Sequence, residues 1–221
     1  MIAIDGPSGV GKSSTAREVA RRLGMSYLDT GAMYRAVAAW ALRQGVIDDP
    51  DVVAAAACDR PVEVGLDPDE PTVGIDGIDV TAAIREPGLS AQVSKVATNQ
   101  RVRDALTAQM RDLIVRSGRI VVEGRDITTK VYPQACVRVL LVADPEVRIR
   151  RRELELGGKV DHAQVTDQVV RRDRDDSTVS EFITPAPGVT LIDSSRRSLK
   201  AVVSLILGLV PDEQLPAGTV R

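Results

Sequence analysis

The segment IAIDGPSGVGKSS, residues 2–14, constrains this chain more than any other part of it. Residues 2–4 are apolar and predict a strand, and the helical periodicity of residues 15–23 predicts a helix. Between them, residues 6–13 follow the pattern G-x-x-x-x-G-K-S. A strand, this loop and a helix in that order are the context of a phosphate-binding P-loop. The alternative is a flexible Gly-rich turn with a surface lysine, and the flanking strand and helix argue against it.

The residue types of this loop have a direct physical use. Gly6, Gly9 and Gly11 let the backbone curl, so that successive N–H groups point into one hollow. The helix that opens there adds its free amides and the positive end of its dipole. Lys12 is then placed to reach the β- and γ-phosphates, and the Ser13 hydroxyl is placed on Mg²⁺.

Composition excludes several classes of protein. The 221 residues are 43% hydrophobic, enough for one large domain or one domain with inserts. The net charge of −2 and the aromatic content of 2% argue against nucleic acid as a partner. A single histidine, His162, does not support a multi-histidine metal site. Only five of the 29 basic residues are lysines, and arginine is the better fork for phosphate oxygens.

The same composition bears on localisation. We expect a cytoplasmic protein with no membrane partner, because the chain has no apolar run of spanning length and no secretory signal. Cys58 and Cys136 lie in unrelated segments, so we expect two reduced, small core residues rather than a disulfide. No apolar segment is left over to form an interface, which predicts a monomer.

The order of the predicted elements indicates an α/β fold. A strand, P-loop, helix, strand and helix open the chain, which points to a parallel sheet with helices on its faces. Apolar runs at 119–124, 137–142 and 189–193 predict further buried strands. Short β-like pieces separated by turn signals predict a small β-rich insert at 60–84. We expect the tail from Pro211 to be disordered.

Charged residues follow several of the predicted strands, at the edge where an open parallel sheet binds ligands. These residues are Asp5, Asp29, Arg125, Asp126, Asp144 and Asp193. Asp144 and Asp193 are simplest as helix caps or solvated loop charges. Arg125 and Asp126 form a charged pair directly after an apolar strand, which favours function. Arg35 could instead be an ordinary surface arginine whose stem packs along an apolar helix. The arginines at 148–152 could instead form the solvated face of a helix.

Four motifs taken together resemble a known family. They are GPSGVGKS at 6–13, LDTGAMYR at 28–35, EGRD at 123–126, and RRD with DST at 171–173 and 176–178. Over about residues 2–208 the chain resembles bacterial cytidylate kinase, and the second and third motifs are far more specific than the P-loop.

The resemblance implies a P-loop kinase fold, a five-stranded parallel sheet with helices on both faces. Its CORE would span 1–30, 100–150 and 185–210, its NMP-binding part 31–99, its LID about 150–180 and its tail 211–221. The implied activity is Mg²⁺-dependent transfer of the γ-phosphoryl group of ATP to CMP or dCMP.

Site residues follow by matching motif. Those implied in catalysis are Lys12, Arg125, Arg148, Arg152 and Arg172. Those implied in ATP binding are Gly6, Pro7, Ser8, Gly9, Val10, Gly11, Lys12, Ser13 and Ser14, with Ser13 also on the metal. Those implied in acceptor binding are Thr30, Tyr34, Arg35, Ser94, Arg103, Arg125, Asp126, Arg172 and Asp176.

The resemblance also implies a role for each group. Arg35 and Arg125 would clamp the acceptor phosphate, and Ser94, Arg103 and Asp126 would contact the cytosine edge, with Thr30 nearby.

Another set belongs to the LID side. Arg172 and Asp176 would contact the sugar, and Arg148, Arg151 and Arg152 would close over the ATP phosphates.

The chain departs from the family after its DST motif. Val179 stands where the family often has an arginine, so that contact is either lost or made by Arg174 or Arg171. Residues 180–187 also differ from the usual run.

Other functions remain open at this point. A small-molecule kinase of shikimate type would share the P-loop but has no need of residues 28–35 or the insert. A GTPase-type switch would need an Asn-Lys-x-Asp guanine reader, which the sequence lacks. The many arginines near a P-loop suit phosphoryl transfer, which needs positive charge and positioning more than a general base.

Overall fold

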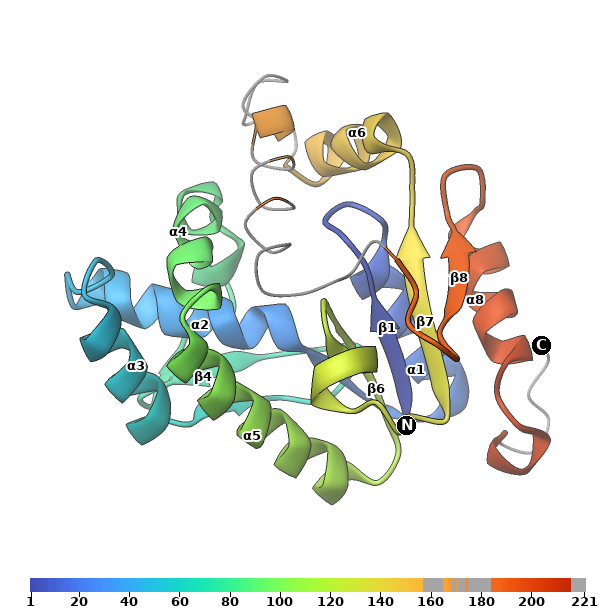
Figure 1. Cartoon of the computed structure of the whole chain (residues 1–221), viewed down its shortest axis with the longest axis horizontal. Coiled ribbons are helices and arrows are strands. Elements are labelled where there is room, and N and C mark those ends of the chain that lie inside the picture. Colours follow the sequence, from blue (N-terminus) through green and yellow to red (C-terminus); the bar gives the residue numbers. More distant parts are fainter. Residues whose placement is uncertain (157–164, 168–169, 171–173, 175–183, 216–221) are drawn as a thin grey trace.

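A five-stranded sheet in the order β2-β6-β1-β7-β8 forms the centre of the molecule (Figure 1). It is seen in a computed structural model that describes residues 1–156, 165–167, 170, 174 and 184–215. The strands are β1 (Ile2–Asp5), β2 (Ser26–Asp29), β6 (Ile120–Gly124), β7 (Val137–Val142) and β8 (Thr190–Asp193). Every pairing is parallel, with Ile2 opposite Val121 on one side and Val137 on the other. The predicted five-stranded parallel sheet is confirmed.

Helices cover both faces of this sheet, which is why its central strands are apolar throughout. On one face, α1 (Lys12–Leu23) and α8 (Leu199–Gly208) pack through Val19 and Ile206 against Ile4 and Leu141. The helices α2 (Thr30–Arg43) and α5 (Gln100–Ser117) contribute to a second cluster that includes Ala3 and Val122 on the other face. Burial on two faces explains the β-branched runs of β6 and β7.

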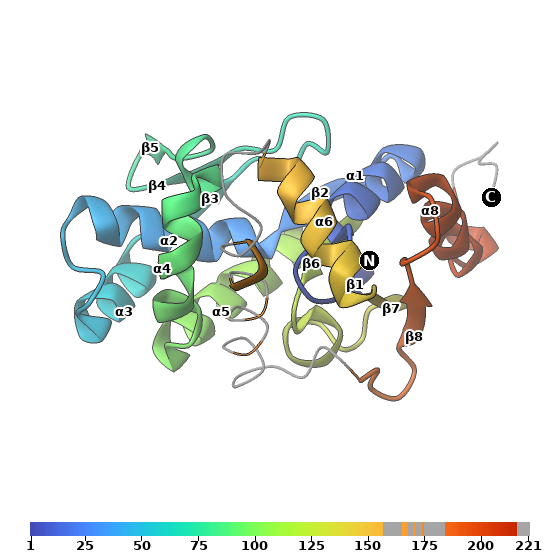
Figure 2. The same cartoon turned by 90° about the horizontal axis from the view of Figure 1, so that it is seen from above.

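The carboxyl ends of the strands lie at one edge of the sheet, and functional loops follow them. The P-loop follows β1, α2 begins directly after β2, and residues 125–126 follow β6. After β7, α6 (Pro145–Leu156) lies over this edge, close to the P-loop in both views (Figures 1 and 2).

Residues 50–97 form a lobe beside the sheet, seen to the left in Figure 1. Its elements are α3 (Pro50–Asp59), β3 (Val62–Val64), β4 (Val73–Ile75), β5 (Ile78–Asp79), a 3₁₀ turn (Ala83–Arg85) and α4 (Pro87–Ala97). The strands β3, β4 and β5 make an antiparallel sheet. Asp76 and Gly77, both with positive φ, form the tight turn between β4 and β5. The structure thus contains the β-rich insert that turn signals predicted.

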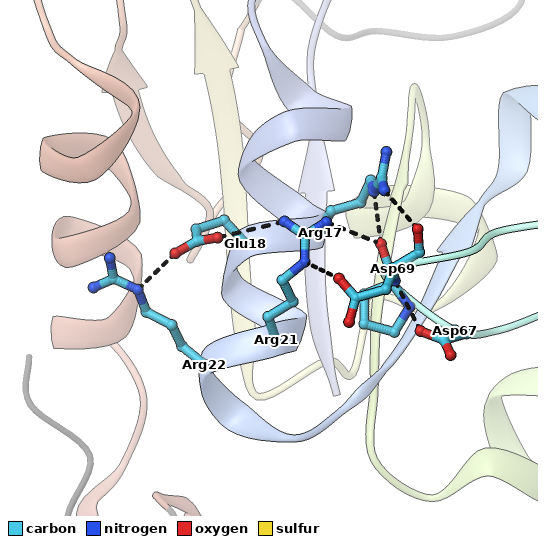
Figure 3. Close-up of polar contacts among 7 residues, drawn as sticks. Arg17, Glu18, Arg21, Arg22, Asp67 and Asp69 are labelled. Carbon is cyan, nitrogen blue, oxygen red and sulfur yellow. Dashed lines mark hydrogen bonds and ion pairs between the residues drawn. The ribbon is translucent and has the colours of Figure 1, made fainter.

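The insert is tied to the P-loop helix by the loop between β3 and β4. Arg17 of α1 donates to the carbonyls of Pro68 (2.7 Å) and Asp69 (3.1 Å), and Arg21 pairs with the Asp69 carboxylate at 2.5 Å (Figure 3). The Tyr27 amide on β2 donates to the carbonyl of Leu66 at 2.8 Å. One loop of the insert is therefore held against the core.

Two expectations from the sequence are wrong. Cys58 and Cys136 are both exposed rather than in the core. The tail is not disordered from Pro211 onward: residues Asp212–Gln214 form a 3₁₀ turn, and Leu215 packs against the α1–α8 cluster. Burying an apolar side chain stabilises that turn. Among the helices described, none is both long and apolar enough to cross a membrane.

Candidate active site

A cavity of about 180 Å³ lies at the carboxyl edge of the sheet and brings together residues from distant segments. Its P-loop wall consists of Ser8, Gly9, Gly11, Lys12, Ser13 and Ser14. Its other walls consist of Asp29, Thr30, Gly31, Tyr34, Arg35, Val93, Ala97, Arg103, Glu123, Gly124, Arg125, Asp126 and Arg152. Most of the residues predicted for the two substrates therefore meet in one place.

The P-loop curls as its glycines predict. Gly9 and Gly11 have φ of 78° and 90°, in the left-handed region that favours glycine. At Gly9 a Cβ atom would lie 2.6 Å from the carbonyl oxygen of Arg148, so the backbone of α6 leaves no room for a side chain at this position. The N-cap residue of α1, Gly11, has no side chain to cap the helix, and the first amides of a helix can bind an anion. The Lys12 ammonium donates to the Pro7 carbonyl at 2.9 Å.

Ser13 contacts a buried carboxylate that the sequence had not singled out. Its hydroxyl donates to Glu123 Oε1 at 2.5 Å, and the Tyr27 hydroxyl donates to the same oxygen at 3.3 Å. Glu123 is the second-last residue of β6 and is 4% exposed. Burial, with the nearby negative charge of Asp29, raises the pKa of Glu123, while Lys12 opposes that shift. An acidic residue at the end of a buried strand, inside the EGRD motif, was the signal available in the sequence.

The two arginines predicted to clamp the acceptor phosphate both line the cavity. Arg35 lies one helical turn into α2, and its Nη2 donates to Asp29 Oδ2 at 2.7 Å. Asp29 also caps α2 by accepting from the Ala32 amide at 2.9 Å. Arg125 comes from the loop after β6. Two guanidinium groups thus approach the P-loop from two different elements.

A buried ion pair closes the far end of the cavity. Arg103 on α5 and Asp126 are each 8% exposed and pair through Arg103 Nη2 and Asp126 Oδ2. Arg103 Nη1 also donates to the Ala97 carbonyl at 3.1 Å. Ser94, expected at the cytosine edge, is not among the residues that line this cavity, and α4 contributes Val93 and Ala97 instead.

Asp5 and Thr30 position the loop that carries Arg125 and Asp126. The Asp5 carboxylate accepts from the amides of Ile127 (2.9 Å) and Thr128 (2.7 Å) and from the Thr128 hydroxyl (2.6 Å). Burial raises the pKa of Asp5 to about 6, although these three bonds lower it. Thr30 donates to the Glu123 carbonyl at 2.8 Å.

The predicted LID residues divide into three groups. Arg152 lines the cavity. Arg148 and Arg151 contact carbonyl oxygens of the P-loop, at Ser8 and Val10 respectively, each at 3.3 Å. Arg172 and Asp176, together with Val179, lie outside the described residues.

This geometry suits the transfer of a phosphoryl group. One side of the cavity offers main-chain amides, a helix N-terminus and Lys12, all of which bind phosphate oxygens. The other side offers guanidinium groups suited to a second phosphate, beside a buried carboxylate suited to a hydrogen-bonding ligand. Within the described residues, no group of three or more His, Cys, Asp or Glu side chains is placed to hold a metal by itself.

Comparisons with known proteins agree with this geometry. The sequence model of the family described as cytidylate kinase matches residues 2–212. A protein of Cutibacterium acnes named cytidylate kinase is 56% identical, over 96% of this chain and 96% of its own length. One of Nocardia farcinica with the same name is 42% identical, over 100% of this chain and 97% of its own. A solved structure of an uncharacterized protein from Eubacterium ventriosum has a TM-score of 0.52 at 12% identity, covering 94% of this chain and 95% of that one, which shows the fold alone.

Proposed function

Because the chain belongs to the cytidylate kinase family, we propose that it transfers the γ-phosphoryl group of ATP to CMP or dCMP. The observation that carries the proposal is that Arg35 and Arg125 line the same cavity as the P-loop residues Gly9, Gly11 and Lys12 to Ser14. A donor polyphosphate and an acceptor phosphate can therefore meet inside it.

The acceptor in this reaction is already an anion, so no general base is needed. An oxygen of the nucleoside monophosphate attacks the γ-phosphorus, and the bond between that phosphorus and the bridging oxygen of ATP breaks to leave ADP. The P-loop amides and Lys12 hold the donor, Arg35 and Arg125 hold the acceptor phosphate in line, and Arg152 approaches from α6.

Two oxygen atoms of the cavity fit Mg²⁺. The Ser13 hydroxyl and the Glu123 carboxylate lie 2.5 Å apart beside Lys12, and oxygen atoms of this kind are the ligands that Mg²⁺ prefers. When bound with ATP, Mg²⁺ neutralises charge on the β- and γ-phosphate oxygens. Ser13 and Glu123 would hold the ion, directly or through water, and Tyr27 would keep the carboxylate in place.

The buried pair of Arg103 and Asp126 supports cytosine as the base. Asp126 presents a carboxylate that can accept from the exocyclic amino group of cytosine, and uracil has no such group. Arg103 fixes the orientation of that carboxylate and supplies N–H donors of its own. The cytosine roles of Ser94 and Thr30, the sugar roles of Arg172 and Asp176, and the assignment of Tyr34 to the acceptor remain part of the proposal.

A coupled assay tests the proposal by offering CMP, dCMP, UMP, AMP and shikimate separately as acceptors, with ATP and Mg²⁺. We expect CMP and dCMP to be the best acceptors, and removal of Mg²⁺ by chelation to abolish transfer. Preference for another acceptor would overturn the substrate. Slow GTP hydrolysis without any acceptor preference would favour a nucleotide switch.

Acceptor variants sharpen this test. Replacing Arg125 by Ala should raise the KM for CMP by about 100-fold and leave the KM for ATP within about twofold, because a charge-assisted phosphate contact is lost on one side only. Equal losses for both substrates would contradict the assigned role.

We further propose that the protein is a cytoplasmic monomer. Sedimentation of the purified protein would measure its oligomeric state.

A further inference from the structure

Two arginines of α6 donate hydrogen bonds to main-chain carbonyls of the P-loop. Arg148 Nη1 donates to the carbonyl of Ser8, and Arg151 Nη1 donates to the carbonyl of Val10, each at 3.3 Å. Val10 is 1% exposed and does not line the cavity, whereas its neighbours Gly9 and Gly11 do. The two guanidinium groups therefore hold main-chain carbonyls of the loop.

A peptide plane connects each of these carbonyls to an amide of the cradle. None of the peptide bonds that the structure describes is cis, so the C=O and N–H of each P-loop peptide unit point in opposite directions. The Val10 carbonyl and the Gly11 amide belong to one unit, and the Ser8 carbonyl and the Gly9 amide belong to another. A carbonyl held by a guanidinium group consequently fixes the direction of the next amide, and both residues that carry these amides, Gly9 and Gly11, line the cavity.

Ser194 joins Arg151 and the Val10 carbonyl in one hydrogen-bond network. Its hydroxyl donates to the Val10 carbonyl at 3.0 Å and accepts from Arg151 Nη1 at 3.0 Å. Its own carbonyl accepts from Arg151 Nη2 at 2.8 Å, and its amide is anchored to the Val142 carbonyl at the end of β7. Ser194 is 3% exposed, so this network is shielded from water.

The glycines explain why the loop needs such a support. A backbone at positive φ has no side chain to fix its peptide planes, and glycine is the residue with the greatest conformational freedom. A cradle of amides stabilises a phosphate only when the amides already point at it. The loop sequence permits the curl, and contacts from outside the loop must select it.

We propose that Arg151, with Ser194, is a positioning residue that aims the Gly11 amide at the donor phosphates, and that Arg148 does the same for Gly9. This assigns Arg148 and Arg151 to the support of the loop, and not to direct contact with ATP. The inference rests on the proposed use of the P-loop for ATP, but it does not depend on which acceptor is used.

The test compares Arg151→Ala and Ser194→Ala with a matched control, Arg150→Ala. Arg150 is exposed on the same helix, so its removal takes away the same charge without touching the loop. Calorimetry with the β,γ-imido analogue of ATP and Mg²⁺ measures donor affinity, and steady-state kinetics measures both KM values.

We expect Arg151→Ala to weaken analogue binding and raise the KM for ATP by about tenfold, the loss typical of a hydrogen bond to a charged group. Ser194→Ala should weaken analogue binding by about threefold. The double variant should weaken it little more than Arg151→Ala does, because both groups act on one carbonyl. In these variants the KM for CMP should stay within about twofold of that of the unaltered protein. In Arg150→Ala the analogue affinity and both KM values should stay within the same limit.

Equal rises in both KM values, or an Arg151→Ala variant that binds the analogue as Arg150→Ala does, would overturn the proposal. If Arg151→Ala fails to fold, Ser194→Ala and Arg151→Lys test the proposal in its place. Lysine keeps a hydrogen-bond donor, so Arg151→Lys should bind the analogue less tightly than the unaltered protein without losing the whole contribution of Arg151. The calorimetric readout keeps this inference separate from the proposed function: a protein that does not phosphorylate CMP can still lose analogue affinity in these variants.

Discussion

The P-loop side of the cavity is made of main-chain groups from one short segment, whereas the opposite side is made of side chains from segments far apart in the sequence. Residues 8–9 and 11–14 supply the first wall, and β1 and α1 extend directly from that segment. The second wall takes Arg35 from α2, Arg103 from α5 and Asp126 from the loop after β6. A wall of amides is indifferent to the identity of the base, while a wall of specific side chains can select an acceptor.

The largest expected effect lies on the donor side. Lys12→Ala should reduce transfer by at least about 100- to 1,000-fold with every acceptor, because it removes a cation from the developing charge on the transferred group. Initial rates with CMP, dCMP and UMP would measure it, with Lys200→Ala on the exposed surface of α8 as the control. Residual activity that differs strongly between acceptors would contradict the division between the two walls.

The sequence predicted the P-loop side of the cavity in large part because that side is local. The pattern of glycines, the lysine and the helix start all fall within residues 6–15, and nothing distant is needed to place them. The lining of the opposite side was predicted in part. Arg125 and Asp126 were found because the ends of parallel strands share one edge of a sheet.

Contacts that depend on which strands are neighbours were missed. The pair of Ser13 and Glu123, with Tyr27, exists because β6 lies between β1 and β2, with Asp29 opposite Glu123. Strand order is not written in any local pattern.

The rotation of α4 about its axis was also not predictable from the sequence. Val93 and Ala97 line the cavity although Ser94 was expected there, and a shift of one residue turns the helix by about 100°.

The next largest effect lies on the acceptor side, at the buried pair of Arg103 and Asp126. Asp126→Ala should lower the free energy of unfolding by about 3–5 kcal/mol, because it leaves the Arg103 charge buried without its carboxylate. It should also weaken CMP use far more than ATP binding. Urea unfolding and the two KM values would measure these effects.

A double replacement separates stability from recognition at this pair. Arg103→Met with Asp126→Leu should recover most of the lost stability, since two apolar side chains leave no buried charge. It should not recover CMP use, because neither residue can hydrogen-bond a base. Recovery of both properties together would show that the pair serves packing alone and would remove the base reader from the acceptor wall.

A smaller effect is expected at Asp5, which joins the two walls. This residue ends β1, directly before the P-loop, and its carboxylate holds the amides of Ile127 and Thr128 beside Asp126. Burial raises its pKa from 3.8 to about 6. A carboxyl group that binds its proton more tightly in the folded state stabilises the fold below its unfolded pKa, and that contribution is lost as the pH rises through the folded pKa.

Comparison with Asp5→Asn, which cannot titrate, isolates this contribution. Between about pH 4 and pH 6, the stability of the unaltered protein should fall relative to the variant by up to about 3 kcal/mol, and the difference should be flat above pH 7. Urea unfolding at a series of pH values would measure it. A difference that grows in the opposite direction would mean that the three hydrogen bonds outweigh burial at this carboxylate.

The smallest effect is expected where the insert meets the P-loop helix. Arg21 and Asp69 form an exposed ion pair, and such pairs are screened by water and salt. Arg17 still holds the same loop through the carbonyls of Pro68 and Asp69 when Arg21 is removed. Arg21→Ala should therefore change both KM values by less than about twofold. Removing both arginines should increase hydrogen exchange in residues 65–72, because the loop then loses its side-chain hydrogen bonds to α1.

Arg116→Ala is the matched control for this last prediction, because Arg116 forms an exposed ion pair with Asp112 on α5, at 2.7 Å, away from the loop. If the double variant at Arg17 and Arg21 raises the KM for CMP and not that for ATP, the position of the insert belongs to the acceptor wall alone. If it raises the KM for ATP as well, α1 transmits the change to Lys12 and Ser13, and the two walls are mechanically coupled through the P-loop helix. Hydrogen exchange that increases as much in Arg21→Ala alone would show that the exposed ion pair, rather than the two carbonyl contacts of Arg17, holds the insert to the core.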